Sequence, residues 1–352
     1  MARIVYAMEQ EISLERESVN EVESFKYLGT VISNTGSLDL EFSAWNIRTL
    51  QEVTNTNRLE RRTALVCKEL ARFNIDVVAL SETRLPEEGN IRESGKGYTI
   101  FWKGKALEEP RIHGVGFTLH SQLVHQHNLA PKAISERLMT VRIPITLNSH
   151  LTLISVYAPT MTSTDDDKAV FYTQHDHTIQ TVPANNKLVG LGDFNARVGK
   201  DHRIWEGIIG RHGIGNCSAN GQLLLGLCAE HQLVLTNTIF QLPKRHKTTW
   251  RHPRSKHWNT LDYVLTRDRD RGDVHITRSM PGAGDCWTDH RLLISQLSVA
   301  EADCQRRIRE AQKTWWQRKA AETQSFATNV TCAASMQQQR KYSVPHGHQW
   351  AA

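Results

Sequence analysis

The 352-residue sequence has no long hydrophobic run. No stretch approaches the roughly 18 apolar residues that a membrane-spanning helix needs, so the sequence predicts no membrane association. The first residues, MARIVYAMEQEISLERE, lack the apolar core of a secretory signal and become acidic early. We therefore expect a nuclear or cytoplasmic protein rather than a secreted one, and the sequence indicates no obligate protein partner.

Cysteine is also scarce, and it is not arranged for metal or disulfide chemistry. The six cysteines form neither a CxxC pair nor a zinc-ligand spacing, and the chain has no internal repeat. In a chain without a secretory signal we expect reduced thiols, as is usual in the cytosol and the nucleus.

The residues that are present describe a folded chain with a basic balance. Hydrophobic residues make up 39% of the sequence, which is enough for a packed core, and charged residues make up 23%. The formal net charge is +6, with 17 histidines besides. This modest positive excess fits a polyanionic partner without identifying one.

Between residues 42 and 297 short apolar segments recur, with a few helical segments between them. FSAWNI, DVVALSE, LTLISVYAP and LDYVLT are typical of these strands. Residues 57–73 carry apolar side chains at helical spacing with arginine and lysine opposite, and residues 220–233 show similar spacing. Many strands with a few helices predict an α/β sandwich rather than an all-β barrel.

The segment LVGLGDFNARVG, residues 188–199, ends an apolar run in two polar residues. Side chains alternate along a strand, so Asp193 and Asn195 point to one side while Phe194 points into a core. One interpretation is an Asx turn that closes the strand. The other is a carboxylate and an amide that face a metal-bound phosphate or a water.

Several other predicted strands end in polar residues of the same chemical kind. Each such residue alone has an ordinary structural explanation as a turn, a cap or a packing residue. Asp262 fits that explanation least, because a carboxylate between Leu261 and Tyr263 needs a cationic or hydrogen-bonding partner. The full strand-end set is Asn46, Glu82, Tyr157, Asp193, Asn195, Asp262, Asp289 and His290.

The ordered motifs WN, SETR, VYAP, GDFNA, LDYVL and DH resemble those of the endonuclease/exonuclease/phosphatase superfamily. SAWNIRTL, SETRLPEEG, GLGDFNARVG and TTWRHPRSKHWNTLDYVLT are more narrowly similar to the apurinic-type endonucleases of LINE retrotransposons, especially the RTE type. The resemblance covers residues 42–298. It implies a DNase I-like fold, which is a four-layer α/β sandwich of two packed mixed β-sheets with outer helices.

The resemblance also implies a metal site. Glu82 matches the main metal carboxylate, and Asn46 and Asp289 would lie with it around Mg²⁺, with Mn²⁺ as the alternative ion. Asn46 would also hydrogen-bond a phosphate oxygen as negative charge develops.

Five further residues match catalytic positions of the same family. His290 matches the catalytic base, and Asp262 matches the carboxylate that orients and polarises it. Asp193 would orient the attacking water or protonate the leaving group. Asn195 and Tyr157 would hydrogen-bond phosphate oxygens.

Two positions depart from the pattern of cellular abasic-site endonucleases. Arg48 stands where those enzymes carry an acidic residue, although LINE enzymes often have arginine there, which argues against a dedicated abasic-repair role. In WTDH, Thr288 replaces the usual serine and keeps the hydroxyl.

A basic stretch ahead of LDYVL has tryptophans between its cations. Its charged residues are Lys244, Arg245, His246, Lys247, Arg251, Arg254 and Lys256. This stretch is predicted to contact a DNA backbone, and the alternative is a solvated hairpin. The residues that we assign to DNA binding are Arg48, Arg84, Lys247, Trp250, Arg251 and Trp258.

The two ends of the sequence differ from its centre. VESFKYLGTVISNTGSLDLE resembles part of a LINE reverse transcriptase, although no YxDD-type polymerase motif is present. We therefore expect a rearranged chain with four parts. These are a poorly packed fragment at 1–41, the endonuclease/exonuclease/phosphatase domain at 42–298, a linker helix at 299–324 and a disordered tail at 325–352.

The leading hypothesis for function is Mg²⁺-dependent hydrolysis of phosphodiester bonds, with nicking of double-stranded DNA as the activity. One alternative keeps the fold and changes the substrate, to that of a phosphatase or phospholipase of the same superfamily. The other is a retroelement relic without enzymatic activity.

Overall fold

The computed structural model describes residues 24–27, 30–33, 37–51, 61–93, 95–145, 149–282 and 288–300. All of them lie within a compact unit that comprises residues 1–300. Residues 1–23, the expected tail and most of the expected linker helix lie outside the described residues. Val299 and Ala300 are described, and they end a strand rather than begin a helix. None of the helices in the described stretches is both long and apolar enough to span a bilayer.

The first sheet is mixed. Strands β3 and β4 pair in parallel and its other pairs are antiparallel, in the order β1-β2-β3-β4-β7-β6-β5, with β19 joining β3 to β18. Its strands are β1 (Ser24–Tyr27), β2 (Thr30–Ser33), β3 (Ser37–Asn46), β4 (Val77–Ser81), β5 (Glu88–Glu93), β6 (Tyr98–Lys103), β7 (Val115–His120), β18 (Val274–Met280) and β19 (Leu292–Ala300).

The second sheet is mixed as well. Strands β10 and β11 pair in parallel within the order β14-β17-β11-β10-β9-β8. Its strands are β8 (Lys132–Ser135), β9 (Leu138–Pro144), β10 (His150–Tyr157), β11 (Lys187–Asp193), β14 (Leu233–Leu235) and β17 (Asp262–Arg267). Two small antiparallel pairs lie outside the main sheets, namely β12 (Val198–Gly199) with β13 (Ile214–Cys217), and β15 (Trp250–Arg251) with β16 (Trp258–Asn259).

Within the described residues, four α-helices lie in the connections between strands. They are α2 (Arg62–Arg72), α3 (Ser121–His127), α4 (Asp165–Gln180) and α5 (Ala219–Glu230), and three short 3₁₀ turns are η1 (Thr236–Thr238), η2 (Lys244–His246) and η3 (Asp268–Asp273). The Thr164 hydroxyl caps α4 by accepting a hydrogen bond from the Asp167 amide. Three aspartates in the first turn of α4 add favourable charge at its amino end.

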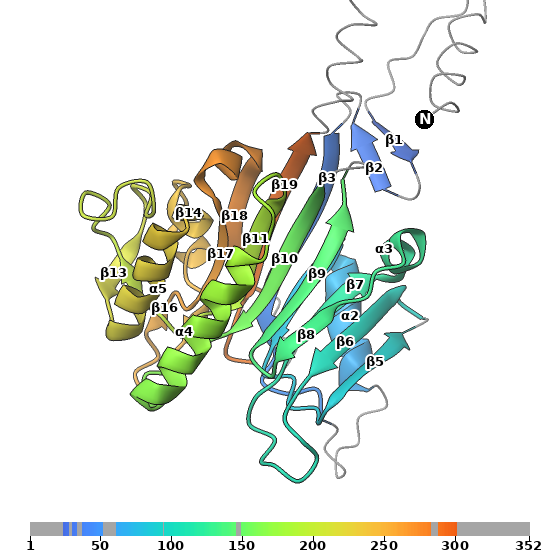
Figure 1. The fold of residues 1–352 in the computed structure, drawn as a ribbon, viewed down its shortest axis with the longest axis horizontal. Helices are drawn as coiled ribbons and strands as arrows, with labels where there is room; N and C mark the ends of the chain where they lie inside the picture. The colour runs from blue at the N-terminus through green and yellow to red at the C-terminus, as the bar shows by residue number, and fades with distance from the viewer. Residues whose placement is uncertain are drawn as a thin grey trace, which may run out of the picture. The chain divides into compact units, whose positions relative to one another are not determined.

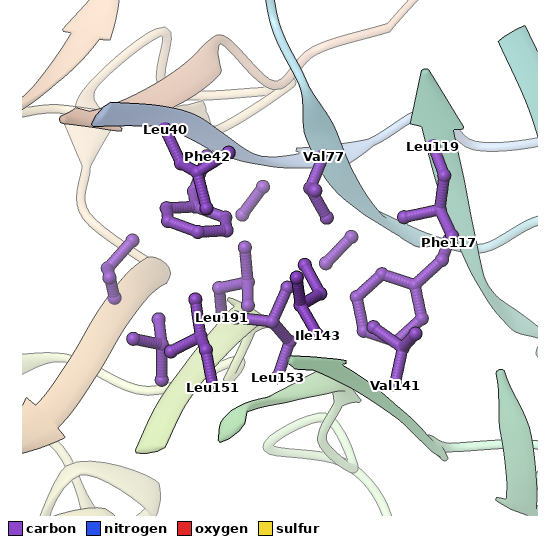
Figure 2. Packing of buried hydrophobic residues seen from close by; sticks show 14 of the residues in the cluster. Leu40, Phe42, Val77, Phe117, Leu119, Val141, Ile143, Leu151, Leu153 and Leu191 are labelled. Atoms are coloured by element: carbon purple, nitrogen blue, oxygen red, sulfur yellow. The ribbon is translucent and has the colours of Figure 1, made fainter. Parts of the chain in front are cut away.

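Three separate apolar clusters define the layers of the fold. The first lies between the sheets, where Phe42 and Phe117 face Leu153 and Leu191 (Figure 2). The second packs α4 and α5 on the outer face of the second sheet, and Phe194 is buried there as the sequence predicted (Figure 1). The third packs α2 on the outer face of the first sheet. The predicted four-layer α/β sandwich is confirmed.

The amino-terminal boundary of the sandwich differs from the sequence prediction. Strand β3 begins at Ser37, and Leu40 is only 2% exposed in the core between the sheets. Residues 37–41 therefore belong to the packed sheet, and the predicted boundary at residue 42 lies too late. In the sequence, Leu38 and Leu40 alternate with Asp39 and Glu41, as is typical of a strand with one buried face, and Leu38 to Leu40 pair with β19.

Candidate active site

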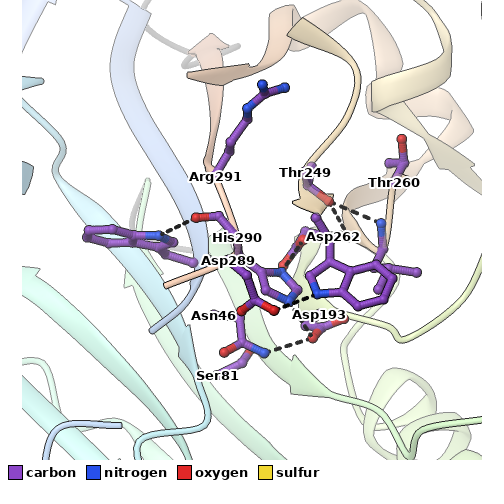
Figure 3. Close-up of polar contacts among 12 residues, drawn as sticks. Asn46, Ser81, Asp193, Thr249, Thr260, Asp262, Asp289, His290 and Arg291 are labelled. Atoms are coloured by element: carbon purple, nitrogen blue, oxygen red, sulfur yellow. Dashed lines mark hydrogen bonds and ion pairs between the residues drawn. The ribbon is translucent and has the colours of Figure 1, made fainter. Parts of the chain in front are cut away.

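The strand-end residues meet because the sheets align their strands. In the second sheet Tyr157 pairs with Asp193, and Asp193 pairs with Asp262 on the next strand. In the first sheet Asn46 pairs with Ser81, directly before Glu82. One edge of the sandwich therefore collects these polar side chains, which we call the polar rim (Figure 3).

His290 and Asp262 form a pair in the most buried part of the polar rim. His290 Nδ1 lies 2.9 Å from Asp262 Oδ2, and Asp262 is fully buried. His290 Nε2 lies 3.9 Å from Asp193 Oδ2. Burial alone would lower the pKa of His290, but the charges of Asp262 and Asp193 outweigh burial and raise that pKa to about 9. The shift favours the charged form of His290, and the role of catalytic base that the sequence assigns to it stays a prediction.

The pKa of Asp193 lies well above that of an ordinary carboxyl group. Burial and then the nearby charge of Asp262 raise its pKa to about 7, although His290 and a 2.9 Å hydrogen bond from Asn46 Nδ2 oppose the shift. A carboxyl group with this pKa can accept or release a proton near neutral pH.

Asn195 forms the Asx turn that was the first of the two interpretations of GDFNA. Its backbone amide donates to Asp193 Oδ1 at 2.9 Å, which makes the expected Asx turn. Its side-chain amide donates to the Ala158 carbonyl at 2.9 Å. Asp193 therefore closes the turn with one oxygen and receives Asn46 with the other.

Glu82 joins the rim through Asn46. The Asn46 amide nitrogen donates at 2.9 Å to both Glu82 Oε1 and Asp193 Oδ2, so a single amide connects the two sheets. The second oxygen of Glu82 pairs with Arg84 Nη2 at 2.6 Å. Glu82, Arg84, Arg48 and Asn195 all have positive φ angles between 47° and 60°. Strained backbone of this kind clusters where side chains must be held in place.

Tyr157 is held by two residues that the sequence did not single out. Arg137 donates from Nη1 to the Tyr157 carbonyl at 3.2 Å, and its guanidinium lies 5.3 Å from the Tyr157 ring. His113 contacts Arg137 Nη2 at 3.1 Å. Burial, together with the charges of Glu82 and Asp193, raises the pKa of Tyr157 well above its usual range. The Tyr157 hydroxyl therefore stays protonated and can donate.

The WTDH segment ties the last strand to the rim. The Thr288 hydroxyl donates to the Asn46 carbonyl at 2.6 Å and accepts from the His290 amide at 3.1 Å. Asp289 Oδ2 accepts from Trp250 Nε1 at 3.0 Å, and Asp289 Oδ1 lies 3.8 Å from Arg48 Nε. Trp250 also bridges to His290 through the backbone.

The basic residues do not all join the rim in the same way. Arg251 is exposed and pairs across the small hairpin with Trp258, whose ring lies 3.5 Å from the Arg291 guanidinium carbon. Lys247 instead donates to the His212 carbonyl at 2.9 Å, so its amine is held by backbone. Arg291, which the sequence did not single out, fixes the hairpin by donating to the carbonyl oxygens of Arg245 and Thr248.

The donor set of the rim fits a hard divalent cation. Its ligand atoms are carboxylate and amide oxygens, the kind that Mg²⁺ prefers. Asp193, Asp262 and His290 offer atoms that lie within 4.8 Å of one another. The buried Asp262 Oδ1 has no hydrogen-bond partner, so the rim holds an acceptor in excess. The sequence assigned the ion to Glu82, Asn46 and Asp289, and the structure brings Asn46 within hydrogen-bond distance of Glu82.

Comparison with known proteins identifies the family of this chain. The model of the Endonuclease/Exonuclease/phosphatase family matches residues 43–290. Craniofacial development protein 2 of Bos taurus is 31% identical over 258 residues, which is 72% of this chain and 40% of that protein. The chain thus spans about two fifths of the length of that relative.

Two solved structures share the fold at low sequence identity. AP endonuclease LMAP from Leishmania major is 14% identical with a TM-score of 0.53, over 74% of this chain and 88% of that chain. The 3′ phosphatase NExo from Neisseria, bound to a product DNA hairpin, is 15% identical with a TM-score of 0.51, over 73% and 99%. The predicted DNase I-like fold is confirmed.

Proposed function

Because the chain belongs to the endonuclease/exonuclease/phosphatase family, we propose that it hydrolyses phosphodiester bonds of double-stranded DNA in a Mg²⁺-dependent reaction. The observation that supports this most directly is the polar rim itself. His290, paired with Asp262, faces Asp193, and Asn46 connects Asp193 to Glu82. Asp193, which we assign to proton transfer, therefore lies between the charged imidazole of His290 and the carboxylate of Glu82, which we assign to the metal.

The side chains divide the chemistry of hydrolysis between them. Asp193, with a pKa of about 7, accepts the proton of the attacking water or returns one to the leaving oxygen. Protonated His290 and the Tyr157 hydroxyl donate to phosphate oxygens, where negative charge increases in the transition state. Bound Mg²⁺, held by Glu82 and Asn46, would add positive charge at the phosphate.

Several features support DNA as the substrate. Arg48, Arg84, Arg251 and Trp258 contribute exposed or half-exposed positive and aromatic groups around the rim, with Trp250 beside Asp289. Cations paired with phosphates and aromatic side chains against bases are the usual elements of DNA binding. The two solved structures that share the fold are named for action on DNA. Lys247, held by a backbone carbonyl, would contribute mainly long-range charge.

Nicking of supercoiled plasmid tests the proposal. The wild type with Mg²⁺ should convert supercoiled plasmid to open circles, and Glu82→Ala should lose most of this rate. Glu206→Ala, which removes an exposed carboxylate in a loop, is the matched control and should nick like the wild type. Equal nicking by wild type and Glu82→Ala would identify a contaminant and contradict the proposal.

A second assay separates the alternatives within the family. An oligonucleotide that ends in a 3′-phosphate reports phosphatase activity, and short-chain phospholipid reports phospholipase activity. Turnover of either one without nicking would assign the rim to that substrate. A folded protein with no Mg²⁺-dependent turnover of any of the three would support the retroelement relic.

A further inference from the structure

Both oxygens of Glu82, the residue that we assign to the metal, are already occupied by the protein. Asn46 Nδ2 donates to Oε1 at 2.9 Å, and Arg84 Nη2 pairs with Oε2 at 2.6 Å. A carboxylate oxygen can accept more than one partner, but a cation that binds Glu82 meets the positive Arg84 guanidinium already paired with Oε2. Of the two donors only Arg84 is charged. Its displacement breaks the ion pair with Glu82 and removes a positive charge that would repel the cation.

The backbone holds Arg84 in this position. The Arg84 amide donates to the His113 carbonyl at 3.0 Å, and the Thr83 amide donates to the Gly114 carbonyl at 3.1 Å. Gly114 has a φ of +129°, and a Cβ there would lie 2.3 Å from Thr83 Oγ1. Glu82 and Arg84 both have left-handed φ angles near 55°, so the backbone is constrained at both members of the pair.

Arg84 has no competing acidic partner. Among the described residues, its one ion pair is with Glu82. The Arg84 Nε atom is buried without a hydrogen-bond partner, so the guanidinium is not anchored at both ends. Its side chain is 38% exposed, so it has room to move into solvent. Arg84 therefore pairs with Glu82 through one end of its guanidinium and can separate from it into solvent.

We propose that Arg84 is an internal counter-ion of Glu82 that exchanges with the divalent cation. It neutralises Glu82 when no cation is bound, and it lowers the affinity of the rim for Mg²⁺ or Mn²⁺. Cation binding releases its guanidinium toward the substrate phosphate. This inference rests on the proposed function only in placing the cation at Glu82, and its test does not use catalysis.

Binding of Mn²⁺ without DNA tests the exchange. Free Mn²⁺ is measured from its electron paramagnetic resonance signal during titration of the wild type and of Arg84→Met, which keeps the apolar stem and removes the charge. The variant should bind Mn²⁺ about three- to tenfold more tightly, in line with loss of a partly exposed ion pair. Arg84→Gln is the second variant if Arg84→Met does not fold.

Three comparisons make the result decisive. Arg111→Met, which removes an exposed arginine in the loop before Gly114, should bind Mn²⁺ like the wild type. The double variant Glu82→Ala, Arg84→Met should lose the gained affinity. Unchanged or weaker Mn²⁺ binding by both Arg84 variants, or an equal gain in Arg111→Met, would overturn the inference. If Glu82→Ala alone binds Mn²⁺ like the wild type, the cation lies elsewhere and the metal role in the proposed function fails instead.

Discussion

Two histidines are buried in the described part of the chain, and their surroundings shift their pKa values in opposite directions. His290 is 7% exposed and its pKa is raised to about 9, whereas His175 is 1% exposed and its pKa is lowered to about 3. Burial lowers the pKa in both cases. The difference is that Asp262 and Asp193 face His290, whereas the rings of Phe171 and Phe194 lie beside His175.

This contrast shows what keeps one buried histidine charged and the other neutral. His175 lies on α4 against the second sheet, and its Nδ1 atom has no hydrogen-bond partner. It is neutral at physiological pH and fills space among aromatic rings. His290 keeps a positive charge in an equally buried place because two carboxylates share it. Charge at a buried site is therefore set by neighbours rather than by depth.

Loss of the Asp262 carboxylate beside His290 should produce the largest effect. Asp262→Asn keeps a hydrogen-bond partner for His290 Nδ1 but removes the negative charge. The pKa of His290 should then fall from about 9, because only Asp193 and Asp289 remain to oppose burial, and nicking should slow by about 10²- to 10⁴-fold. Histidine titration by NMR and plasmid nicking measure the two effects.

The matched control for this change is Asp166→Asn, an exposed aspartate in the first turn of α4. It should leave both the histidine titration and the nicking rate unchanged. A pKa near 9 for His290 in Asp262→Asn would show that its charge does not depend on Asp262.

Removal of the second histidine should alter stability rather than activity. The pKa of His175 is about 3 in the folded protein and 6.5 in the reference state, so the unfolded chain binds the proton more tightly. The stability that neutral His175 supports is present above pH 6.5 and is lost as the pH falls from 6.5 toward 3. His175→Leu should therefore lose less stability on acidification, by about 1–3 kcal/mol between pH 7 and pH 4.5.

Urea unfolding at both pH values measures this difference. His125→Leu, which removes an exposed histidine on α3, should keep the pH dependence of the wild type. If His175→Leu and the wild type lose the same stability, His175 is not the group that responds to acid.

A buried carboxylate sharpens the comparison with a smaller effect. Burial raises the pKa of Asp76 from 3.8 to about 6, although a hydrogen bond from the Glu41 amide opposes the shift. The folded protein thus binds this proton more tightly than the unfolded chain, so stability falls as the pH rises from about 4 to 6 and stays lower above it. Asp76→Asn should stabilise the protein by about 1 kcal/mol at pH 7.

The gain from Asp76→Asn should disappear below pH 4, where the carboxyl group is protonated in both states. Thermal unfolding at pH 7 and pH 4 measures it, with Asp166→Asn as the exposed control. Destabilisation at pH 7 would show that the Glu41 hydrogen bond outweighs the cost of burying the charge.

Much of the polar rim was predictable because strand ends are visible in the sequence. Asn46, Asp193 and Asp262 each follow or begin an apolar run, and strand pairing brings such positions to one edge. Thr288 kept its hydroxyl in WTDH, and the structure gives that hydroxyl two hydrogen bonds. The order of the motifs identified the family that the comparisons confirm.

The residues and elements that the sequence did not predict lie where no apolar run meets a polar residue. Arg137 lies in a short connection between β8 and β9, where a charged residue is ordinary, and only the fold brings it onto Tyr157. Helix α4 was not identified because its buried face includes His175 and Thr178 among polar neighbours. The protonation of His290 depends on distances to two carboxylates, which no spacing in the sequence provides.

The position of β19 has a consequence for the protein during synthesis. This late strand inserts between β18 and β3 and brings Thr288 and His290 to Asn46, which is about 240 residues earlier in the chain. While the ribosome is still making β19, β3 has an open edge that can pair with another chain. Nascent chains therefore lack a closed first sheet until translation has passed β19, and prematurely terminated chains should aggregate.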